Sequence, residues 1–461
     1  MKDLTIRNIA KACRGSYHGP AELLDREVTG VSTDSRTAAE GCLFVPIKGE
    51  RVDGHSYITK AMENGALLTL TEHAEGMPAG FPYILVGKTT EAIQEIAGFY
   101  RRSLSAKVVG ITGSVGKTST KEMIAAVLSE KYRVLKTEGN FNNNLGLPLT
   151  VFRMTPETEV AVLEMGISHF GEMTWLAETA EPDIMVITNI GECHTEFLGD
   201  RDGVLRAKTE CLDYVKNDGV VILCGEDDKL RTVKEVHGRR PVFYGLDPSC
   251  RVYAEEITPF GIGGSRVRVN SDDDVFEVEV PMPGTHMVLN ALAGVAAGAA
   301  LGLTNEEIRA GIAKAGALKG HFRIEKINGI TLIDDSYNAS PMSVRAALDV
   351  LAAAGSEKVA VLGDMGELGE REREIHRELG RYAGSLGIKR FITVGPLSEE
   401  TTAGIREADP EAQVSHFSDV DSCLMELSRL IHEGDAVLVK ASHFMKFDRI
   451  SAALSGGEEV K

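Results

Sequence analysis

The chain has 461 residues, of which 43% are hydrophobic, so about two to four domains with substantial cores are expected. Its 50 basic and 68 acidic side chains give a formal net charge of −18, which argues against nucleic acid or an anionic membrane as the main partner. An anionic substrate bound in a local basic pocket is not excluded. The seven cysteines include no C-x-x-C pair, which favours a reducing, cytoplasmic compartment.

Neither the N-terminal segment nor the longest run of low polarity has the features of a membrane-inserted segment. Residues 1–15 mix charged and apolar side chains and lack the apolar core of a signal peptide. The longest run of low polarity, residues 288–303, is short for a membrane span and predicts a buried helix. We therefore expect no membrane span, and we expect a monomer.

Three blocks follow one another along the chain. Residues 1–83 hold short apolar runs, such as CLFVPI at 42–47, separated by Gly, Asp and Ser. Residues 84–316 alternate strand-like and helix-like runs, which predicts a parallel sheet with right-handed crossovers. The strand-like runs of this second block are residues 107–112, 159–166, 183–191 and 219–225, and a helix is predicted over 119–132.

An antiparallel patch is predicted after these strands, because residues 252–257, 265–270 and 275–280 alternate with period two. A long helix is predicted from about His286, and Thr304 with Glu307 predicts a capping box for the next helix.

The third block, residues 317–461, repeats the alternation of strands and helices. Ser340 and Pro341 predict the start of a helix that ends near Leu351. The block has no Gly-rich phosphate loop, so it resembles a dinucleotide-binding topology without the fingerprint. Its strand-like runs are residues 330–335, 358–364, 389–395, 412–417 and 436–442.

A glycine-rich loop lies between the strand at 107–112 and the helix that follows. Strict Walker A spacing would place a Gly at Ile111, so the spacing departs from that motif. Two glycines still permit tight turns whose N–H groups face an anion, and the helix adds its positive end. The alternative is a turn that binds nothing. The candidate phosphate-binding residues are Gly113, Ser114, Val115, Gly116, Lys117, Thr118 and Ser119.

Polar residues follow the next two strands, where ligands gather in open α/β sheets. Glu164 ends one strand, where a metal-facing carboxylate belongs, and His194 follows another. Lys208 lies on a predicted helix, and periodicity alone favours an ordinary exposed lysine. The alternatives for Glu164 and His194 are a solvated strand end and a loop histidine. Cys193 is interpreted as a packed thiol.

Two further groups carry polar chemistry. His286 and Asn290 share one helix face, where capping and internal hydrogen bonds are the alternative to ligand binding. Asp334 and Asp335 directly follow a strand, and two adjacent carboxylates need a partner if they are buried. That partner could be a cation, an amine, a ribose hydroxyl or the start of the next helix.

Taken in this order, three motifs resemble the Mur ligase family, and the resemblance covers essentially the whole chain. They are residues 112–119 (TGSVGKTS), 189–210 (NIGECHTEFLGDRDGVLRAKTE) and 284–293 (GTHMVLNALA). The resemblance implies an α/β protein with three domains. These would be a small mixed α/β domain over 1–83 for a UDP-linked precursor, a central phosphate-loop domain over 84–316, and a Rossmann-like domain over 317–461 for ATP and the incoming dipeptide.

Within the family, four stretches are similar to the member that adds D-alanyl-D-alanine. The member that adds the third amino acid would be expected to have a D-N-P-R motif and a D-Y-A-H segment, and this chain has neither. Two departures are visible, because Ala441 and His443 stand where the family usually has Gly and Arg. The four stretches are residues 137–150, 334–348, 361–370 and 437–450.

The resemblance implies a role for each candidate residue. Lys117 would neutralise phosphate charge, Thr118 and Glu164 would hold one Mg²⁺, and His194 with a carbamylated Lys208 would hold a second. The nucleotide would be held by Asn290, Arg323 and Asp335. The UDP-linked substrate would be contacted by Ser35, Asn142 and Asn143, and the segment with Tyr337 and Asn338 is a candidate for binding the dipeptide and removing its proton.

The implied reaction is ATP-dependent peptide ligation. D-alanyl-D-alanine would be added to a UDP-N-acetylmuramoyl-tripeptide through an acyl phosphate, as a step of peptidoglycan synthesis. The nearest alternative is a ligase of the same family with another amino donor. More distant alternatives are a regulatory nucleotide-switch ATPase and a binding protein that has lost catalysis.

Overall fold

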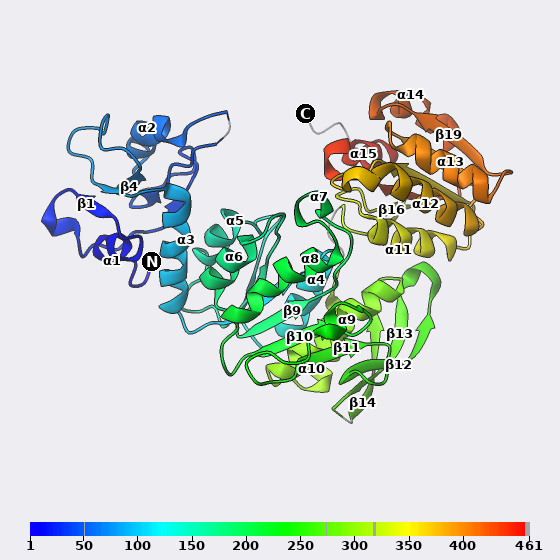
Figure 1. Cartoon of the computed structure of the whole chain (residues 1–461), viewed down its shortest axis with the longest axis horizontal. Coiled ribbons are helices and arrows are strands. Elements are labelled where there is room, and N and C mark those ends of the chain that lie inside the picture. The colour runs from blue at the N-terminus through cyan, green and yellow to red at the C-terminus, as the bar shows by residue number, and fades with distance from the viewer. Residues whose placement is uncertain (50, 273, 317–319, 457–461) are drawn as a thin grey trace. The chain divides into compact units, whose positions relative to one another are not determined.

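A computed structural model describes residues 1–49, 51–272, 274–316 and 320–456. These residues form a mixed α/β protein with three separate β-sheets and helices packed on them (Figure 1). The three sheets agree with the predicted fold class. The predicted domain start at residue 317 and the last five residues lie outside the described ranges.

The N-terminal sheet has five short strands in the order β1-β5-β4-β3-β2. Its inner strands pair in parallel, whereas β1 pairs antiparallel to β5. The helices in this part are α1 (Ile6–Ala12), α2 (Ile58–Glu63) and α3 (Thr89–Arg102). The strands are β1 (Ser16–His18), β2 (Val31–Ser32), β3 (Leu43–Phe44), β4 (Leu68–Thr71) and β5 (Tyr83–Leu85).

The central sheet has nine strands in the order β14-β13-β12-β11-β10-β9-β6-β8-β7. Its four predicted strands are present as β6 (Lys107–Thr112), β8 (Val160–Glu164), β9 (Ile184–Ile187) and β10 (Val220–Cys224). The short strands β7 (Val134–Lys136) and β11 (Val242–Gly245) were not predicted. The predicted antiparallel patch is confirmed as β12 (Val252–Pro259), β13 (Ser265–Ser271) and β14 (Asp274–Val280).

Helix α9 (Thr285–Ala300) confirms the predicted buried helix, because eleven of its residues are buried. It packs against α4 (Lys117–Leu128), the helix that follows the glycine-rich loop. The predicted capping box of Thr304 and Glu307 is present at the start of α10 (Asn305–Lys314). No described helix has the length and apolar character needed to cross a bilayer. The remaining helices here are α5 (Gly146–Val151), α6 (Glu172–Ala180), α7 (Thr195–Leu198) and α8 (Arg201–Thr209).

The C-terminal sheet has six strands in the order β15-β16-β20-β17-β18-β19. All five predicted strands are present and pair in parallel. They are β16 (Ile330–Asp334), β17 (Lys358–Gly363), β18 (Arg390–Val394), β19 (Gln413–Phe417) and β20 (Ala436–Lys440). The antiparallel edge strand β15 (Arg323–Ile327) was missed, because its charged and apolar residues leave it only partly buried.

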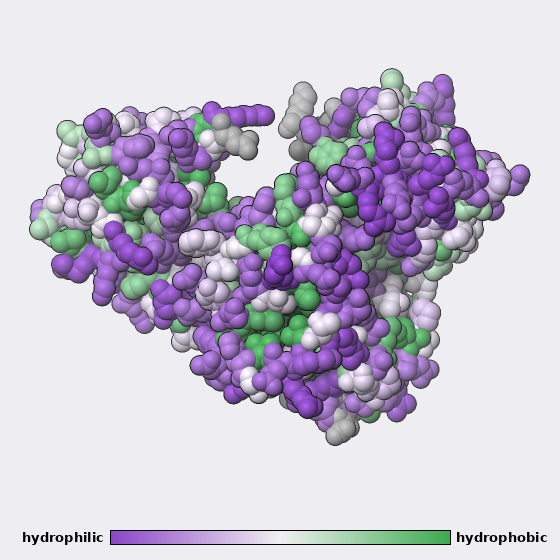
Figure 2. Space-filling view, in the orientation of Figure 1, coloured by the Kyte–Doolittle hydropathy of each residue, from purple (hydrophilic) through white to green (hydrophobic). Residues whose placement is uncertain are grey.

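Helices cover both faces of this sheet, and their outer surface is charged. Helix α11 (Pro341–Ala352) begins at the predicted cap Ser340, and the others are α12 (Glu372–Ser385), α13 (Ser398–Ala408), α14 (Val420–Leu430) and α15 (Asp448–Ser455). Ion pairs join α12 to α13, for example Arg377 to Glu400 at 3.0 Å and Arg381 to Glu407 at 2.7 Å. Figure 2 shows the largely hydrophilic surface over these two helices.

A buried carboxylate joins several elements at the amino ends of the central strands. Asp183 Oδ2 accepts hydrogen bonds from Arg101 at 3.3 Å and from the Val108 N–H at 2.9 Å. Asp183 Oδ1 accepts from Lys107 at 2.9 Å and Lys216 at 3.0 Å. Burial by itself would raise the pKa of Asp183, but the Val108 N–H and the two lysines bring it below its ordinary value.

We expect Asp183→Asn to lower the free energy of unfolding by about 3 kcal/mol, because the buried Arg101 loses its counter-ion. A carboxyl whose folded pKa is depressed stabilises the fold above its unfolded pKa, so the deficit should shrink below about pH 4. Urea unfolding at pH 7 and pH 3.5 measures both effects. The exposed Asp218→Asn is the matched control, and an equal effect of the two variants would contradict this role.

Candidate functional site

The described chain forms two compact units, and the candidate residues are divided between them. The first comprises Met1–Ile111, Tyr132–Met185 and Thr209–Val220, and it holds Ser35, Asn142, Asn143 and Glu164. The second comprises Thr112–Lys131, Val186–Lys208 and the described chain from Val221 onward. It holds the phosphate loop, His194, Lys208 and all the candidates of the C-terminal sheet, and each unit is described by itself below.

The glycine-rich loop has the backbone that the sequence predicted. Gly116 is the residue before α4 and has a left-handed φ of 81°, which a glycine adopts without strain. Gly113 makes a close approach, since a Cβ there would lie 1.9 Å from Thr188 Oγ1. The helix therefore starts directly at Lys117, and its first N–H groups lie at the end of the loop.

Two residues that sequence reasoning missed hold this loop in place. The Val115 N–H donates to Asn189 Oδ1 at 2.9 Å, and Asn189 Nδ2 donates back to the Val115 carbonyl at 3.0 Å. Thr188 Oγ1 donates to the same carbonyl at 2.6 Å. The Ser114 N–H donates to the Asn189 carbonyl at 3.0 Å. Asn189 was within reach of prediction, because it is the first residue of the motif at 189–210.

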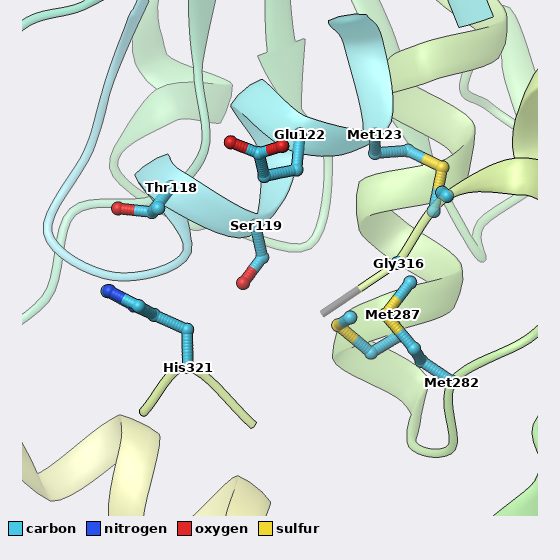
Figure 3. A pocket seen from close by; sticks show the side chains of 9 residues that line it. Thr118, Ser119, Glu122, Met123, Met282, Met287, Gly316 and His321 are labelled. Atoms are coloured by element: carbon cyan, nitrogen blue, oxygen red, sulfur yellow. The ribbon is translucent and has the colours of Figure 1, made fainter. Parts of the chain in front are cut away.

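The side chains of the first turn of α4 face a small pocket. Figure 3 shows the Thr118 and Ser119 hydroxyls there, with the His321 ring opposite them and Met123, Met282 and Met287 also in the lining. Lys117 Nζ lies over the loop and donates to the Gly113 carbonyl at 2.9 Å. Hydroxyl groups, an ammonium group and helix N–H groups in one place can neutralise and bind an anion.

His194 and Lys208 belong to the same neighbourhood as the loop. Burial lowers the pKa of His194, the charges of Lys208 and Lys117 act in the same direction, and Glu367 opposes them. His194 Nδ1 lies 2.5 Å from Glu367 Oε2. Lys208 is 1% exposed, so the alternative of an ordinary exposed helix lysine is wrong.

Glu164 is a buried carboxylate at the end of β8. It is 2% exposed, so the alternative of a solvated strand end is wrong. In the sheet register it pairs with Ile111, the residue at the end of β6. Asn142 Nδ2 donates to Glu164 Oε1 at 2.8 Å, whereas Asn143 Oδ1 accepts from the Gly146 N–H at 2.9 Å. Asn142 thus orients the carboxylate, and Asn143 accepts from the first N–H of α5.

Ser35 lies in a polar turn of the N-terminal domain. It is 7% exposed, and its carbonyl accepts a hydrogen bond from Asn64 Nδ2 at 2.7 Å. The side chain of the preceding Asp34 accepts from the Arg36 N–H at 2.9 Å and pairs with the Arg36 side chain. The turn therefore has a defined shape and presents an exposed guanidinium group beside Ser35.

Asn290 and His286, which both lie on α9, have partners elsewhere in the protein. Asn290 Oδ1 accepts from Thr120 Oγ1 at 2.9 Å and lies near Gly116 at the end of the phosphate loop. Burial lowers the pKa of His286 to about 4, and the charge of Lys440 acts in the same direction. His286 is therefore a neutral ring at pH 7, packed edge-on against Phe322 at 4.9 Å.

The adjacent carboxylates after β16 have different partners. Asp335 forms an ion pair with Lys440, which is 2% exposed and also donates to the Asn338 carbonyl at 2.9 Å. Asp334 accepts from the hydroxyls of Ser336 at 2.6 Å and Ser451 at 2.7 Å. Of the partners considered from sequence, an amine serves Asp335, whereas the serine hydroxyls that serve Asp334 were not among them.

Tyr337 and Arg323 have different kinds of partner: Tyr337 contacts aromatic rings, and Arg323 forms an ion pair. Tyr337 is flanked by two imidazoles, with ring centroids 4.3 Å from His321 and 5.2 Å from His443. His321 also lines the pocket beside Thr118. Arg323 starts β15 and forms an ion pair with Glu325, so its guanidinium group is engaged along its own strand.

The two departures from the family pattern have structural explanations. Ala441 is fully buried, and its methyl group lies 2.6 Å from where a Cβ on Gly363 would be. The glycine at position 363 thus leaves the space that Ala441 fills. His443 packs its ring edge-on against Tyr337, so an aromatic contact occupies the position where a guanidinium group is usual.

The available side chains fit a nucleotide with Mg²⁺. Mg²⁺ is held in such sites by one or two protein oxygens together with phosphate oxygens and water. No group of three or more His, Cys, Asp or Glu suited to a metal is found within the described ranges. Thr118, on the first turn of α4 in the second unit, and Glu164, buried in the first unit, each carry an oxygen donor of this chemical type.

Comparisons with known proteins agree along the whole chain. Residues 111–298 match the Mur ligase middle domain, residues 322–443 the Mur ligase glutamate ligase domain, and residues 27–101 the Mur ligase family catalytic domain. A Bacillus subtilis (strain 168) protein named UDP-N-acetylmuramoyl-tripeptide--D-alanyl-D-alanine ligase is 38% identical, over 97% of each chain.

Solved structures give the same result. A crystal structure of MurF from Acinetobacter baumannii superposes with a TM-score of 0.90 at 30% identity, over 98% of each chain. MurF ligase from Thermotoga maritima in complex with ADP superposes with a TM-score of 0.83 at 29% identity, over 93% of this chain and 97% of the other.

We expect Asn189→Ala to weaken the binding of an ATP analogue about 30-fold, because Val115 loses two side-chain hydrogen bonds of about 1 kcal/mol each. Calorimetric titration gives the Kd. The exposed Asn217→Ala is the control and should bind the analogue as the wild type does. An unchanged Kd in Asn189→Ala would mean that the hydrogen bonds of Asn189 to Val115 do not shape the glycine-rich loop for binding.

Proposed function

The chain belongs to the Mur ligase family, and from that membership we propose that it joins D-alanyl-D-alanine to a UDP-N-acetylmuramoyl-tripeptide with consumption of ATP. The products are the UDP-N-acetylmuramoyl-pentapeptide of peptidoglycan synthesis, ADP and phosphate. The proposal is supported by the name of the Bacillus subtilis relative and by the MurF structures that superpose on this chain. We place the reaction in the cytoplasm.

The observation that carries this proposal is the burial of Lys208 beside the phosphate loop. A lysine that is 1% exposed, and whose charge acts on His194 together with Lys117, is a candidate functional residue, because buried ionisable groups with charged neighbours gather at functional sites. Simple hydrolysis of ATP requires the loop and a positioned water and gives this lysine no role. Ligation requires further charge control, because an anionic carboxylate must approach the anionic nucleotide.

The reaction proceeds in two steps on this reading. A carboxylate oxygen of the tripeptide attacks the γ-phosphorus of ATP, and the bond to the β–γ bridging oxygen breaks to release ADP. The amine nitrogen of the dipeptide then attacks the acyl carbon, loses a proton and expels phosphate. Lys117 and the N–H groups of residues 113–119 stabilise charge on the transferring phosphoryl group.

Two Mg²⁺ sites are assigned to the chain's own oxygen and nitrogen donors. Thr118 and Glu164 would hold one ion, and His194 with a carbamylated Lys208 would hold the other. Bound Mg²⁺ screens the negative charge of the phosphates and of the attacking carboxylate. The carbamate forms when the neutral amine of Lys208 adds to CO₂ and releases a proton, and burial favours that neutral amine.

The binding roles follow the three proposed domains, 1–83, 84–316 and 317–461. The first domain would hold the uridine diphosphate through the turn with Ser35, and Asn142 and Asn143 would line the path of the tripeptide. The third domain would contact ATP and the dipeptide. Its contributions would come from Arg323, Asp335, Tyr337 and Asn338, with Asn290 contributing from α9 to the nucleotide site.

Phosphate release from ATP should require both co-substrates, the UDP-linked tripeptide that accepts the phosphoryl group and the D-alanyl-D-alanine whose amine accepts the acyl group. Replacing the dipeptide with meso-diaminopimelate or lysine, each with its matching precursor, should lower the rate by more than about tenfold, since each amino donor needs its own fitted pocket. A coupled phosphate assay with mass spectrometry of the product measures this. Phosphate release without any amine acceptor would favour the nucleotide-switch alternative.

Lys208→Ala should lower kcat about 100-fold or more, because it removes a charge-controlling group next to the transferring phosphate. Added short-chain carboxylates should restore part of the activity by replacing the carbamate. The exposed Arg206→Ala on the same helix is the control and should stay active. Full activity of Lys208→Ala would overturn the carbamate, and an inactive variant without rescue would limit Lys208 to another role.

A further inference from the structure

Within the second compact unit, a loop that follows a strand of the central sheet meets a loop that follows a strand of the C-terminal sheet. The segment between β17 and α12 contacts α7 and the residues just before α7. Glu367 Oε2 lies 2.5 Å from His194 Nδ1, and Arg371 lies 4.0 Å from Glu192. A Cβ on Gly369 would lie 3.8 Å from the Glu196 backbone, so the chains are close there as well.

Glu367 is presented by a loop whose preceding residues are each tied down. The Asp364 carboxylate accepts from Ser398 Oγ at 2.6 Å. The Met365 N–H donates to the buried His376 at 2.9 Å, and the Gly366 N–H donates to Ser442 Oγ at 3.0 Å. These bonds come from α12, α13 and the loop after β20, so the position of Glu367 is set by the C-terminal sheet.

Both partners of the contact have an unfavourable backbone conformation. His194 has a φ of 53° and Glu367 a φ of 61°, values at which residues other than glycine are uncommon. Such conformations persist where the surroundings impose them, and they cluster at functional sites. Neither residue is buried deeply enough for core packing to require the conformation, since their side chains are 25% and 54% exposed.

His194 has two lysines and one carboxylate, that of Glu367, as charged neighbours. Lys117 and Lys208 act on the ring from α4 and α8, and Glu367 is the acidic group that faces its Nδ1 atom. In metal sites, a histidine ligand commonly donates its other ring N–H to a carboxylate, which fixes the tautomer and the orientation of the ring. The 2.5 Å contact with the Glu367 carboxylate favours the tautomer with the proton on Nδ1, and that tautomer leaves the Nε2 lone pair available to a metal.

We propose that Glu367 is a positioning residue for His194, holding the Nδ1–H tautomer and the ring orientation in which Nε2 binds Mg²⁺. The inference rests on the proposed function, which makes His194 a metal ligand. It assigns a residue of the C-terminal sheet to a metal site that the motifs place entirely in the central domain. Formation of the metal site thereby depends on the loop after β17 reaching His194.

The test uses the full chain with Glu367→Gln, Glu367→Ala and the control Glu370→Gln, an exposed glutamate of the same loop. Calorimetry measures the Kd of Mg²⁺ with a non-hydrolysable ATP analogue bound. Glu367→Ala should weaken Mg²⁺ binding about 10- to 100-fold, as for other residues behind a metal ligand. Glu367→Gln keeps an acceptor without the charge and should lie between, whereas Glu370→Gln should match the wild type.

A second readout does not involve the metal. Nitrogen NMR of selectively labelled histidine, with the His194 signal assigned by His194→Gln, reports the ring tautomer. The wild type and Glu370→Gln should show Nδ1–H, and Glu367→Ala should show a mixture or the other tautomer. Thermal unfolding should be similar in all variants, because a merely structural contact would change the melting temperature and leave the tautomer unchanged.

The outcomes separate this inference from the proposed function. If His194→Gln weakens Mg²⁺ binding but Glu367→Ala changes neither the Mg²⁺ Kd nor the tautomer, the positioning role is wrong and the metal role of His194 stands. If His194→Gln leaves Mg²⁺ binding unchanged, the metal role of His194 is wrong, and the inference falls with it.

Discussion

The conformation of Val115 is the constraint on which the candidate site depends. The Val115 N–H donates a hydrogen bond to the side chain of Asn189, and the Val115 carbonyl accepts hydrogen bonds from the side chains of Asn189 and Thr188. These partners follow the strand β9, which neighbours β6 in the sheet. The loop shape is therefore a property of two adjacent strands, and the helix that starts at Lys117 inherits its direction from it.

Charged groups buried at the carboxyl ends of strands share one energetic requirement. Each needs a partner, because an isolated buried charge is strongly unfavourable. Asn142 bonds Glu164 in one unit, and in the other Lys440 pairs with Asp335. Polar residues that were expected to contact ligands thus contact other protein side chains in the structure. Substrates must enter networks that already orient their members, which suits catalysis by positioning and electrostatics.

Neighbouring loops of the C-terminal sheet each carry a polar residue. Its loops after β16, β17 and β20 carry Asp335, Glu367 and His443, and the structure brings each to a defined partner. Strand β20 lies between β16 and β17 in this sheet, so its loop can contact both neighbouring loops. The departure at Ala441 is accommodated by Gly363 at the end of β17, which shows how two strand ends compensate for each other.

The sequence by itself determined the class of fold and the type of most candidate side chains. Strands buried on both faces, such as β6 and β16, were predicted because a continuous apolar run has few other readings. Strands β7, β11 and β15 were missed, because short or half-buried strands leave a weak pattern. The glycines of the phosphate loop were recognised because backbone geometry restricts which residue can stand there.

Only the tertiary structure decided which of these residues are buried and what they touch. Periodicity assigned Lys208 to an exposed face, and the fold buries it. Two interactions join segments that are far apart in the chain: the hydrogen bonds between Asn189 and Val115, and the contact of Glu367 with His194. A sequence records the apolar face of each element, but the order of strands in a sheet decides which loops meet, and that order arises from packing.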